Sequence, residues 1–316
     1  LALGGGFVVA WVSYGQDGDS SGLVGRMFDL DGSPRSDEFI VNEYIIKQQD
    51  YPSVGSLEDG GFVVAWDSNG QDGDGRGVYA KVYNYDGTIR KGEFLVNQEV
   101  ASVQTRGHPS GLENGFVITW QSLGQDGESG GIYARLFNLD GTAAGNEFLV
   151  NQYTERSQTI PAVAALSAGE GFIIAWQSEY QDTDGFGVFA RMYMDDGTPR
   201  TDDFQVNQVV ASDQYLVSIA ALNGGRFVIS WQSNNQDGDS LGIFARSYGC
   251  STDNDCISPK ICQVSTNMCR YCLTNPDCQH TPDTPICDST TFQCRACTDE
   301  TDCPISEIAA SKIVNV

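Results

Sequence analysis

Short runs of β-branched and aromatic residues, bounded by glycine-rich segments, recur along the chain at a nearly fixed interval. Each of five such runs ends in a tryptophan, and successive tryptophans lie 54 to 56 residues apart. The runs are Phe7 to Trp11, Phe62 to Trp66, Phe116 to Trp120, Phe172 to Trp176 and Phe227 to Trp231. Their composition and length suit buried strands. A repeat near fifty residues indicates an architecture in which each unit buries its apolar face against its neighbours.

Three further strand-like runs follow each tryptophan run. The second is exemplified by residues 78–83, the third by 93–97 (Glu-Phe-Leu-Val-Asn) and the fourth by 161–166. An Asp-Gly pair separates the second run from the third, always 20 residues after the tryptophan, at Asp31-Gly32, Asp86-Gly87, Asp140-Gly141 and Asp196-Gly197. Asp-Gly between two strand-like runs is a strong hairpin signal, because glycine accepts the positive φ of a tight turn.

Four short antiparallel strands in about 55 residues match one blade of a β-propeller. No segment has a convincing 3.6-residue period, so we expect almost no helix. The predicted fold is all-β, built from tandem four-stranded antiparallel units, and a propeller of five or more blades fits it best. A β-solenoid and a string of separate β-units are the alternatives, because radial closure is not visible in a sequence.

The fifth unit contains an insertion. In the first four units an asparagine follows the tryptophan by 31 residues, but the corresponding Asn315 follows Trp231 by 84. The 53 extra residues nearly equal the 54-residue span of the ten cysteines. We therefore predict a repeat domain of residues 1–249 plus 304–316, with a cysteine-rich module, 250–303, inserted at a hairpin tip. Such tips tolerate insertions because the strand ends stay close together.

Disulfides are expected to hold this module, because it has little apolar sequence from which to build a core. Cys269–Cys272 and Cys294–Cys297 also have a spacing close to that of a four-cysteine zinc site. However, they belong to a regular array with six more cysteines, which favours disulfides. The connectivity stays open for Cys250, Cys256, Cys262, Cys269, Cys272, Cys278, Cys287, Cys294, Cys297 and Cys303.

The second unit shows the repeat motifs most fully. It reads Gly-Gly-Phe-Val-Val-Ala-Trp at 60–66, Gly-Gln-Asp-Gly-Asp-Gly-Arg-Gly-Val-Tyr-Ala at 70–80, Asp-Gly-Thr at 86–88 and Glu-Phe-Leu-Val-Asn at 93–97. With these motifs the unit resembles the tandem repeats of very large secreted bacterial surface proteins, often found near calcium-binding haemolysin-type segments. The inserted module is similar to short Cys-rich repeats of secreted proteins. The resemblance implies an extracellular or cell-surface protein of structural or adhesive type, without catalytic activity.

The loop after each tryptophan carries two acidic residues spaced two apart. Carboxylates at this spacing on a glycine-rich loop can both face a hard cation, so calcium is a candidate cofactor. The EF-hand pattern is not met, and the alternative is a turn in which the aspartates bond nearby backbone N–H groups. The candidate ligands are Asp17, Asp19, Asp72, Asp74, Asp126, Glu128, Asp182, Asp184, Asp237 and Asp239.

Other recurring residues have a structural interpretation and a functional one. The tryptophans are expected to be core wedges between sheets, with a sugar-stacking platform as the alternative. A basic residue recurs in the second strand, and we expect it to pair with an aspartate or cap carbonyls between units; a ligand-binding ring is the alternative. These basic residues are Arg26, Lys81, Arg135, Arg191 and Arg246. His108 and His280 are not repeated and no nucleophile–base–acid set recurs, so we predict no enzymatic activity.

The charge of the chain limits its partners. A formal net charge of −24 repels nucleic acid and anionic membranes, because both are bound by basic patches. No apolar run is long enough to span a bilayer. Copies of the chain itself and cell-surface glycans remain as candidate partners.

The last sequence-based hypothesis concerns assembly. Relative to the repeat period the chain amounts to five units minus one strand, and an incomplete sheet exposes N–H and C=O groups that invite a strand from another copy. Head-to-tail completion of this kind builds a filament. We therefore predict an extracellular structural or adhesive protein, a filament protomer joined by strand sharing. The alternative is a calcium-dependent, lectin-like propeller that binds carbohydrate.

Overall fold

A computed structural model describes residues 5–166, 170–222 and 226–249, together with the backbone of four short strands between residues 261 and 295. These residues form strands, turns and loops and no helix, so the predicted all-β class is confirmed. Accordingly, the described part contains no helix that could cross a membrane. The chain divides into two compact units: unit 1 is Leu1–Ala221 with Val228–Arg246, and unit 2 is Leu222–Phe227 with Ser247–Val316.

The repeats form five antiparallel sheets, one for each tryptophan. The first sheet has the strands β1 (Gly6–Tyr14), β2 (Ser21–Asp29) and β3 (Phe39–Ile40). The second has β4 (Gln49–Ser56), β5 (Phe62–Asn69), β6 (Arg76–Tyr83) and β7 (Ile89–Leu95). The third has β8 (Gln104–Leu112), β9 (Gly115–Leu123), β10 (Gly130–Asn138) and β11 (Phe148–Leu149). The fourth has β12 (Gln158–Ala165), β13 (Phe172–Glu179), β14 (Phe186–Tyr193) and β15 (Phe204–Gln205). The fifth has β16 (Gln214–Ala221), β17 (Phe227–Asn234) and β18 (Leu241–Tyr248).

The fourth run of each sequence repeat belongs to the sheet of the next repeat. β4 pairs with β5, β8 with β9 and β12 with β13, all antiparallel. Each of these sheets therefore starts with a strand from the connection that precedes its tryptophan. The expectation of tandem four-stranded antiparallel units is confirmed for the second, third and fourth sheets, with the boundary shifted by one strand relative to the sequence repeat.

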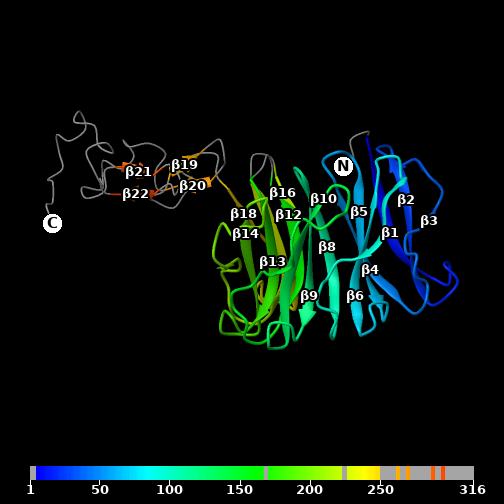
Figure 1. Cartoon of the computed structure of the whole chain (residues 1–316). Helices are drawn as coiled ribbons and strands as arrows, with labels where there is room; N and C mark the ends of the chain where they lie inside the picture. Colours follow the sequence, from blue (N-terminus) through cyan, green and yellow to red (C-terminus); the bar gives the residue numbers. More distant parts are fainter. Residues whose placement is uncertain are drawn as a thin grey trace, which may run out of the picture. The chain divides into compact units, whose positions relative to one another are not determined.

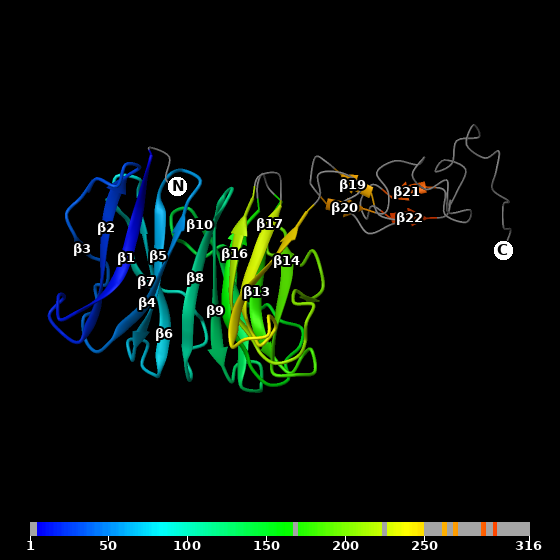
Figure 2. The ribbon, with the colours of Figure 1, turned by 180° about the vertical axis from the view of Figure 1, so that it is seen from behind.

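Successive sheets pack against one another in sequence order, from β1–β3 to the sheet of β13 and β14 (Figure 1). Figure 2 shows the same succession from behind. The first strands of neighbouring sheets adjoin, β4 with β8, β8 with β12 and β12 with β16. This arrangement is propeller-like, and it gathers the first strands of four sheets around one region.

The tryptophans fill the space between sheets. Trp66 packs with Leu23 and Val41 of the preceding repeat, and Trp120 packs with Val78 and Ala80. Trp66, Trp120 and Trp176 are completely buried and Trp231 nearly so. The expectation of core wedges is therefore confirmed for these four, and the alternative of a sugar-stacking platform is wrong for them, because a buried indole offers no face to a ligand.

The recurrent basic residue ties each repeat to the previous one. Lys81, Arg135, Arg191 and Arg246 each donate a hydrogen bond to a valine carbonyl of the preceding repeat, at 2.9 to 3.2 Å. The acceptors are the carbonyls of Val41, Val96, Val150 and Val206. These bonds confirm the prediction that the basic residues cap carbonyls between units.

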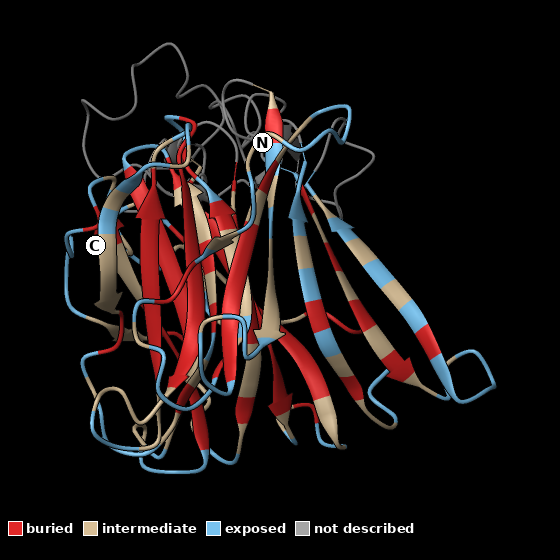
Figure 3. Cartoon of the chain, turned by 90° about the vertical axis from the view of Figure 1, so that its right-hand side faces the viewer, coloured by how far each residue is buried: buried red, intermediate tan, exposed pale blue. Residues whose placement is uncertain are grey.

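The two terminal sheets leave apolar side chains uncovered. Phe7 and Val9 of β1 are about 40% exposed, and Leu241 and Ile243 of β18 are more than half exposed. In Figure 3 buried residues fill the strands in the middle of the stack, whereas strands at its margin alternate between buried and exposed residues.

Unit 2 is described only in part. Its short strands pair as β19 (Ile261–Gln263) with β20 (Met268–Arg270), and β21 (Ile286–Asp288) with β22 (Gln293–Arg295). The backbone register places Cys262 opposite Cys269 and Cys287 opposite Cys294. The side chains of the ten cysteines and residues 304–316 lie outside the described part, so the disulfides and the limits of the inserted module stay predictions.

Candidate functional site

The first strands of the inner sheets share an irregularity at one register position. The pairing of β4, β8 and β12 shifts between Asp50 and Ser53, Thr105 and His108, and Thr159 and Ala162. At each shift, and at the matching position of β16, a residue other than glycine has a φ between 51° and 63°: Tyr51, Arg106, Ile160 and Leu216. Such φ values are unfavourable for residues with a Cβ. Bulges of this kind redirect side chains and occur often next to binding sites.

The residue after each tryptophan supports the bulge of the next sheet. The Oε1 atoms of Gln121 and Gln177 accept the backbone N–H of Ile160 (3.4 Å) and Leu216 (3.1 Å). In the second sheet the equivalent residue is Asp67, whose Oδ1 accepts the N–H of Arg106 at 2.9 Å. Its Oδ2 accepts a hydrogen bond from the Thr105 hydroxyl. The strained backbone is thus held by a polar side chain in each of three sheets, and Asp67 and Gln177 among these side chains are buried.

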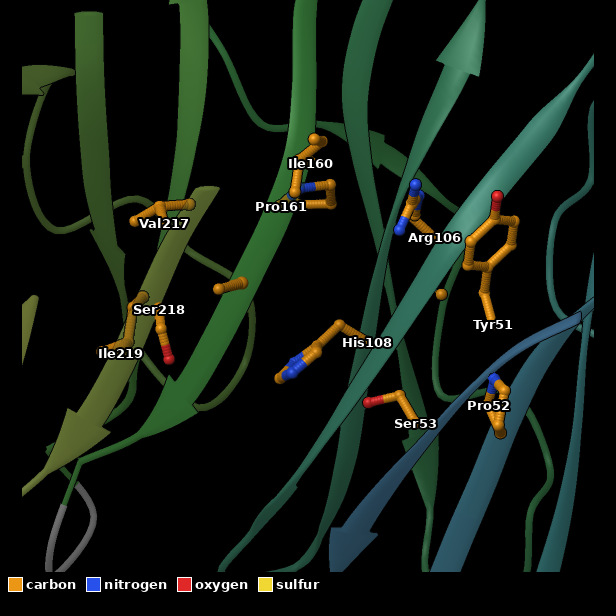
Figure 4. A pocket seen from close by; sticks show the side chains of 12 residues that line it. Tyr51, Pro52, Ser53, Arg106, His108, Ile160, Pro161, Val217, Ser218 and Ile219 are labelled. Carbon is orange, nitrogen blue, oxygen red and sulfur yellow. The ribbon is translucent and has the colours of Figure 1, made fainter. Parts of the chain in front are cut away.

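These bulges line a pocket of about 300 Å³ within unit 1 (Figure 4). Each of the four first strands contributes a short segment, so the pocket is a product of the repeat symmetry. The lining consists of Tyr51, Pro52, Ser53, Arg106, Gly107, His108, Ile160, Pro161, Ala162, Val217, Ser218 and Ile219. Equivalent positions hold different residues, so the backbone around the pocket repeats from strand to strand whereas the side chains that line it differ.

Arg106 and Tyr51 form a stacked pair at the pocket. The guanidinium carbon of Arg106 lies 3.9 Å from the centroid of the Tyr51 ring, and Figure 4 shows the two side chains next to each other. Stacking of a guanidinium on an aromatic face is favourable and leaves the N–H groups at its edge free to donate. Both residues are exposed, so the pair can meet a ligand.

His108 contributes a neutral imidazole. Its Nδ1 accepts the backbone N–H of Val163 at 3.4 Å, and burial lowers the pKa of the ring. With Nδ1 as the acceptor, the proton of the neutral ring lies on Nε2, which can donate. Ser53 and Ser218 add two hydroxyl groups to the lining.

Asp67, which bonds to the backbone of the pocket residue Arg106, is fully buried. Burial raises the pKa of its carboxyl to about 7, although the hydrogen bonds from Thr105 and the Arg106 N–H act in the opposite direction. The protonation state of the group that holds the Arg106 bulge therefore changes near neutral pH.

The candidate calcium ligands lie in the loops between the tryptophan strand and the second strand, where several of them accept backbone N–H groups. The first acidic residue of a loop accepts the N–H two residues further on, as Asp126 does from Glu128 at 3.3 Å. The second acidic residue accepts an N–H from the segment that leads to the next sheet, as Asp74 does from Ser102 at 3.0 Å. This bond lowers the pKa of Asp74, whereas burial raises the pKa of Asp72.

The described residues contain no group of three or more acidic, histidine or cysteine side chains placed to hold a metal ion. The turn alternative accounts for the bonds that these carboxylates make. Calcium binding by the loops therefore stays a prediction.

Sequence reasoning missed the pocket because it searched for residues that recur. Tyr51, Arg106 and Ile160 are equivalent in position but share no chemistry, so comparison of the repeats hides them. The one usable signal was position, since each lies two residues after the buried glutamine that begins its strand.

Comparison with known proteins gives structural likeness only. No family model and no curated protein sequence matches the chain. A protein of unknown function from Dyadobacter fermentans aligns with a TM-score of 0.54 and 13% identity, over 78% of this chain and 76% of its own. An endo-arabinase from Bacteroides thetaiotaomicron gives a TM-score of 0.40 with 18% identity, covering 74% and 92%. An α-L-arabinofuranosidase from Lactobacillus brevis gives 0.43 with 10% identity, covering 76% and 90%. At such identities the likeness concerns the fold.

Two sequence-based predictions are corrected here. The structural filament protomer and the absence of enzymatic activity are not retained, and the proteins with which the chain aligns include an endo-arabinase and an α-L-arabinofuranosidase. The physical reason lies in the geometry of the repeats. In this arrangement a site draws one segment from each sheet, so its chemistry does not recur along the chain, and the lack of a recurring catalytic set did not exclude a site.

Proposed function

We propose that unit 1 is a propeller-like carbohydrate-binding unit and that the pocket at the four first strands is its saccharide site. The observation that carries the proposal is the lining itself: a stacked Arg106–Tyr51 pair, a neutral imidazole and two hydroxyl groups around one cavity. Aromatic edges, neutral donors and an arginine suit a ligand with apolar C–H faces and many hydroxyl groups. The pocket volume is at the lower end of the usual range for ligand sites, which suits one or two sugar rings.

We also propose that the sheets are arranged radially and close into a ring. Sheets arranged radially around the pocket would make it the central cavity of a β-propeller. The uncovered side chains of Phe7 and Ile243 favour a ring larger than five blades, because five closed blades would cover both. An experimental structure in which these two residues meet across a closed five-sheet ring would contradict the larger ring.

The proposal concerns binding, and hydrolysis is to be measured beside it. Most glycoside hydrolases use two carboxyl groups that flank the scissile bond. The lining of this pocket contributes no carboxylate among its described residues. Whether a bound glycan is also cleaved is therefore an experimental question, answered by the release of reducing ends.

The test is binding of the full chain to a panel of neutral and acidic polysaccharides, followed by calorimetry with oligosaccharides of those that bind. Tyr51→Ala should weaken binding at least tenfold, because it removes the ring and the support of the Arg106 guanidinium. Tyr85→Ala is the matched control, since Tyr85 is similarly exposed but lies outside the pocket. Absence of binding to every glycan, or equal affinity of Tyr51→Ala and the unaltered chain, would reject the proposal.

An extracellular location, disulfides in the cysteine-rich module and calcium in the loops complete the proposal as predictions from sequence. Each has a direct check: secretion in the native host, mass spectrometry without reduction, and calorimetry with calcium alone.

A further inference from the structure

At the pocket, the Arg106 guanidinium faces the cavity without an ion pair to a carboxylate among the described residues. Arg106 is the only charged residue in the lining. The chain as a whole has a formal net charge of −24, with 42 acidic against 18 basic residues. Acidic side chains are therefore abundant in this protein, yet none of them lines the pocket beside Arg106.

Other arginines of unit 1 have their guanidinium groups engaged. Arg35, Arg76, Arg90 and Arg200 pair with carboxylates at 2.8 to 3.1 Å. Arg135 and Arg191 donate to backbone carbonyls between repeats. For Arg106, among the described residues, the nearby groups are the Tyr51 ring and the buried Asp67, which bonds to the backbone N–H rather than to the guanidinium.

The backbone conformation of Arg106 is also energetically unfavourable. Its φ of 63° is unfavourable for a residue with a Cβ, and Asp67 holds it there through the backbone. Stacking on Tyr51 restricts the guanidinium plane before any ligand arrives, which reduces the entropy lost on binding. A planar group fixed in this way, with donors along its edge, matches the two oxygens of a carboxylate.

We propose that the pocket recognises acidic sugars, and that Arg106 binds the carboxylate of a uronic acid residue in the glycan. This inference rests on the proposed saccharide site and adds the class of its ligand. His108 supports the assignment, because its neutral ring has a donor at Nε2 for a sugar oxygen. The lining contains no carboxylate that would repel the ligand.

The experiment measures affinity of the full chain by calorimetry for oligomers of galacturonate, glucuronate and the alginate uronates. Each oligomer is compared with its methyl ester, which keeps the sugar and linkage but removes the charge. A hydrogen bond to a charged group corresponds to about a 10- to 100-fold change in affinity. We therefore expect at least one acid to bind about 10- to 100-fold more tightly than its ester.

Arg106→Gln should abolish the difference between acid and ester, and Arg106→Lys should restore part of it. Arg156→Gln is the matched control: Arg156 also stacks on a tyrosine, Tyr180 at 4.6 Å, but lies outside the pocket. Thermal unfolding of Arg106→Gln verifies that the variant is folded, and Arg106→Lys provides a second variant.

The outcomes separate the two proposals. Equal affinity for acid and ester, or binding of neutral glycans alone, overturns the acidic-sugar assignment and leaves the saccharide site standing. A difference between acid and ester that persists in Arg106→Gln also overturns it. If no glycan of either kind binds, the proposed function itself fails.

Discussion

At the residue scale, two kinds of side chain, an amide and a carboxyl, hold the backbone bulges. The residue after the tryptophan holds the bulge of the next sheet, and it is Gln121 or Gln177 in two cases but Asp67 in the third. An amide is neutral at every pH, whereas a buried carboxyl must be either protonated or charged without water around it. Asp67 therefore makes the Arg106 bulge sensitive to pH in a way that its counterparts are not.

Asp67→Asn should remove this sensitivity. The folded-state pKa of Asp67, about 7, lies above its unfolded value near 3.8. The stability that the protonated carboxyl contributes is therefore fully present below pH 4 and is lost as the pH rises towards 7. Relative to the unaltered chain, the variant should gain stability across this window, by at most about 4 kcal/mol. The measurement is the free energy of unfolding in urea at pH 4, 6 and 8.

A control with the opposite sign is available in the same sheet. The hydrogen bond from Thr88 lowers the pKa of the exposed Asp86, so its contribution is present above the unfolded pKa and is lost as the pH falls. Asp86→Asn should therefore show its effect at neutral pH and lose it in acid. Parallel pH profiles for Asp67→Asn and the unaltered chain would show that Asp67 does not titrate in this range.

At the scale of elements, a glycine at the start of the second strand makes room for the loop aspartate. In β10 a Cβ on Gly131 would lie 2.6 Å from Oδ2 of Asp126 and 3.0 Å from its Cγ. The equivalent glycines of the other units face their own loop aspartates in the same way: Gly22, Gly77, Gly187 and Gly242. Loop and strand therefore form one packed element, which explains why Gln-Asp and this glycine recur together.

Gly131→Ala should destabilise the chain by about 1 to 3 kcal/mol, because the added methyl group overpacks against a buried carboxylate. In the double variant with Asp126→Ala the cost should be smaller than the sum of the single costs, since the clash is removed. Gly145→Ala serves as the control, because a Cβ there meets nothing within 4 Å. Strict additivity in urea unfolding would contradict the proposed contact.

The strands were predictable from sequence, and the bulges were not. The alternation of apolar runs with Asp-Gly turns places β5, β6 and their equivalents correctly, and Gly87 and Gly141 have φ values of 84° and 80° as a tight turn requires. By contrast, Tyr51 and Arg106 occupy the left-handed region although neither residue favours it. The conformation of Arg106 is held by a tertiary partner, Asp67, and the residue types at these positions do not signal it.

At the scale of the molecule, each sheet obtains its stability from its neighbours. Trp120 is buried between the second and third sheets, and Arg135 bonds across the same boundary. The pocket depends on this packing because its segments come from four sheets. The pairing of strands follows from the repeat, but the lining of the pocket follows from how the sheets stack, which the sequence pattern does not specify.

Loss of an interior tryptophan should therefore uncouple the two halves of the stack, whereas loss of a terminal one should not. Trp120→Ala is expected to lower the free energy of unfolding by about 3 to 5 kcal/mol, because it leaves a cavity between the second and third sheets. Since sheets on both sides depend on this interface, urea unfolding should split into two transitions. Trp231→Ala removes a nearly buried indole from the fifth sheet, which has one packed neighbour among the described sheets. Its hydrogen-exchange effect should be confined to β16–β18, with β5 and β9 exchanging as before. Uniform acceleration of exchange across all five sheets in both variants would mean that the stack unfolds as one cooperative body and that position in the series does not matter.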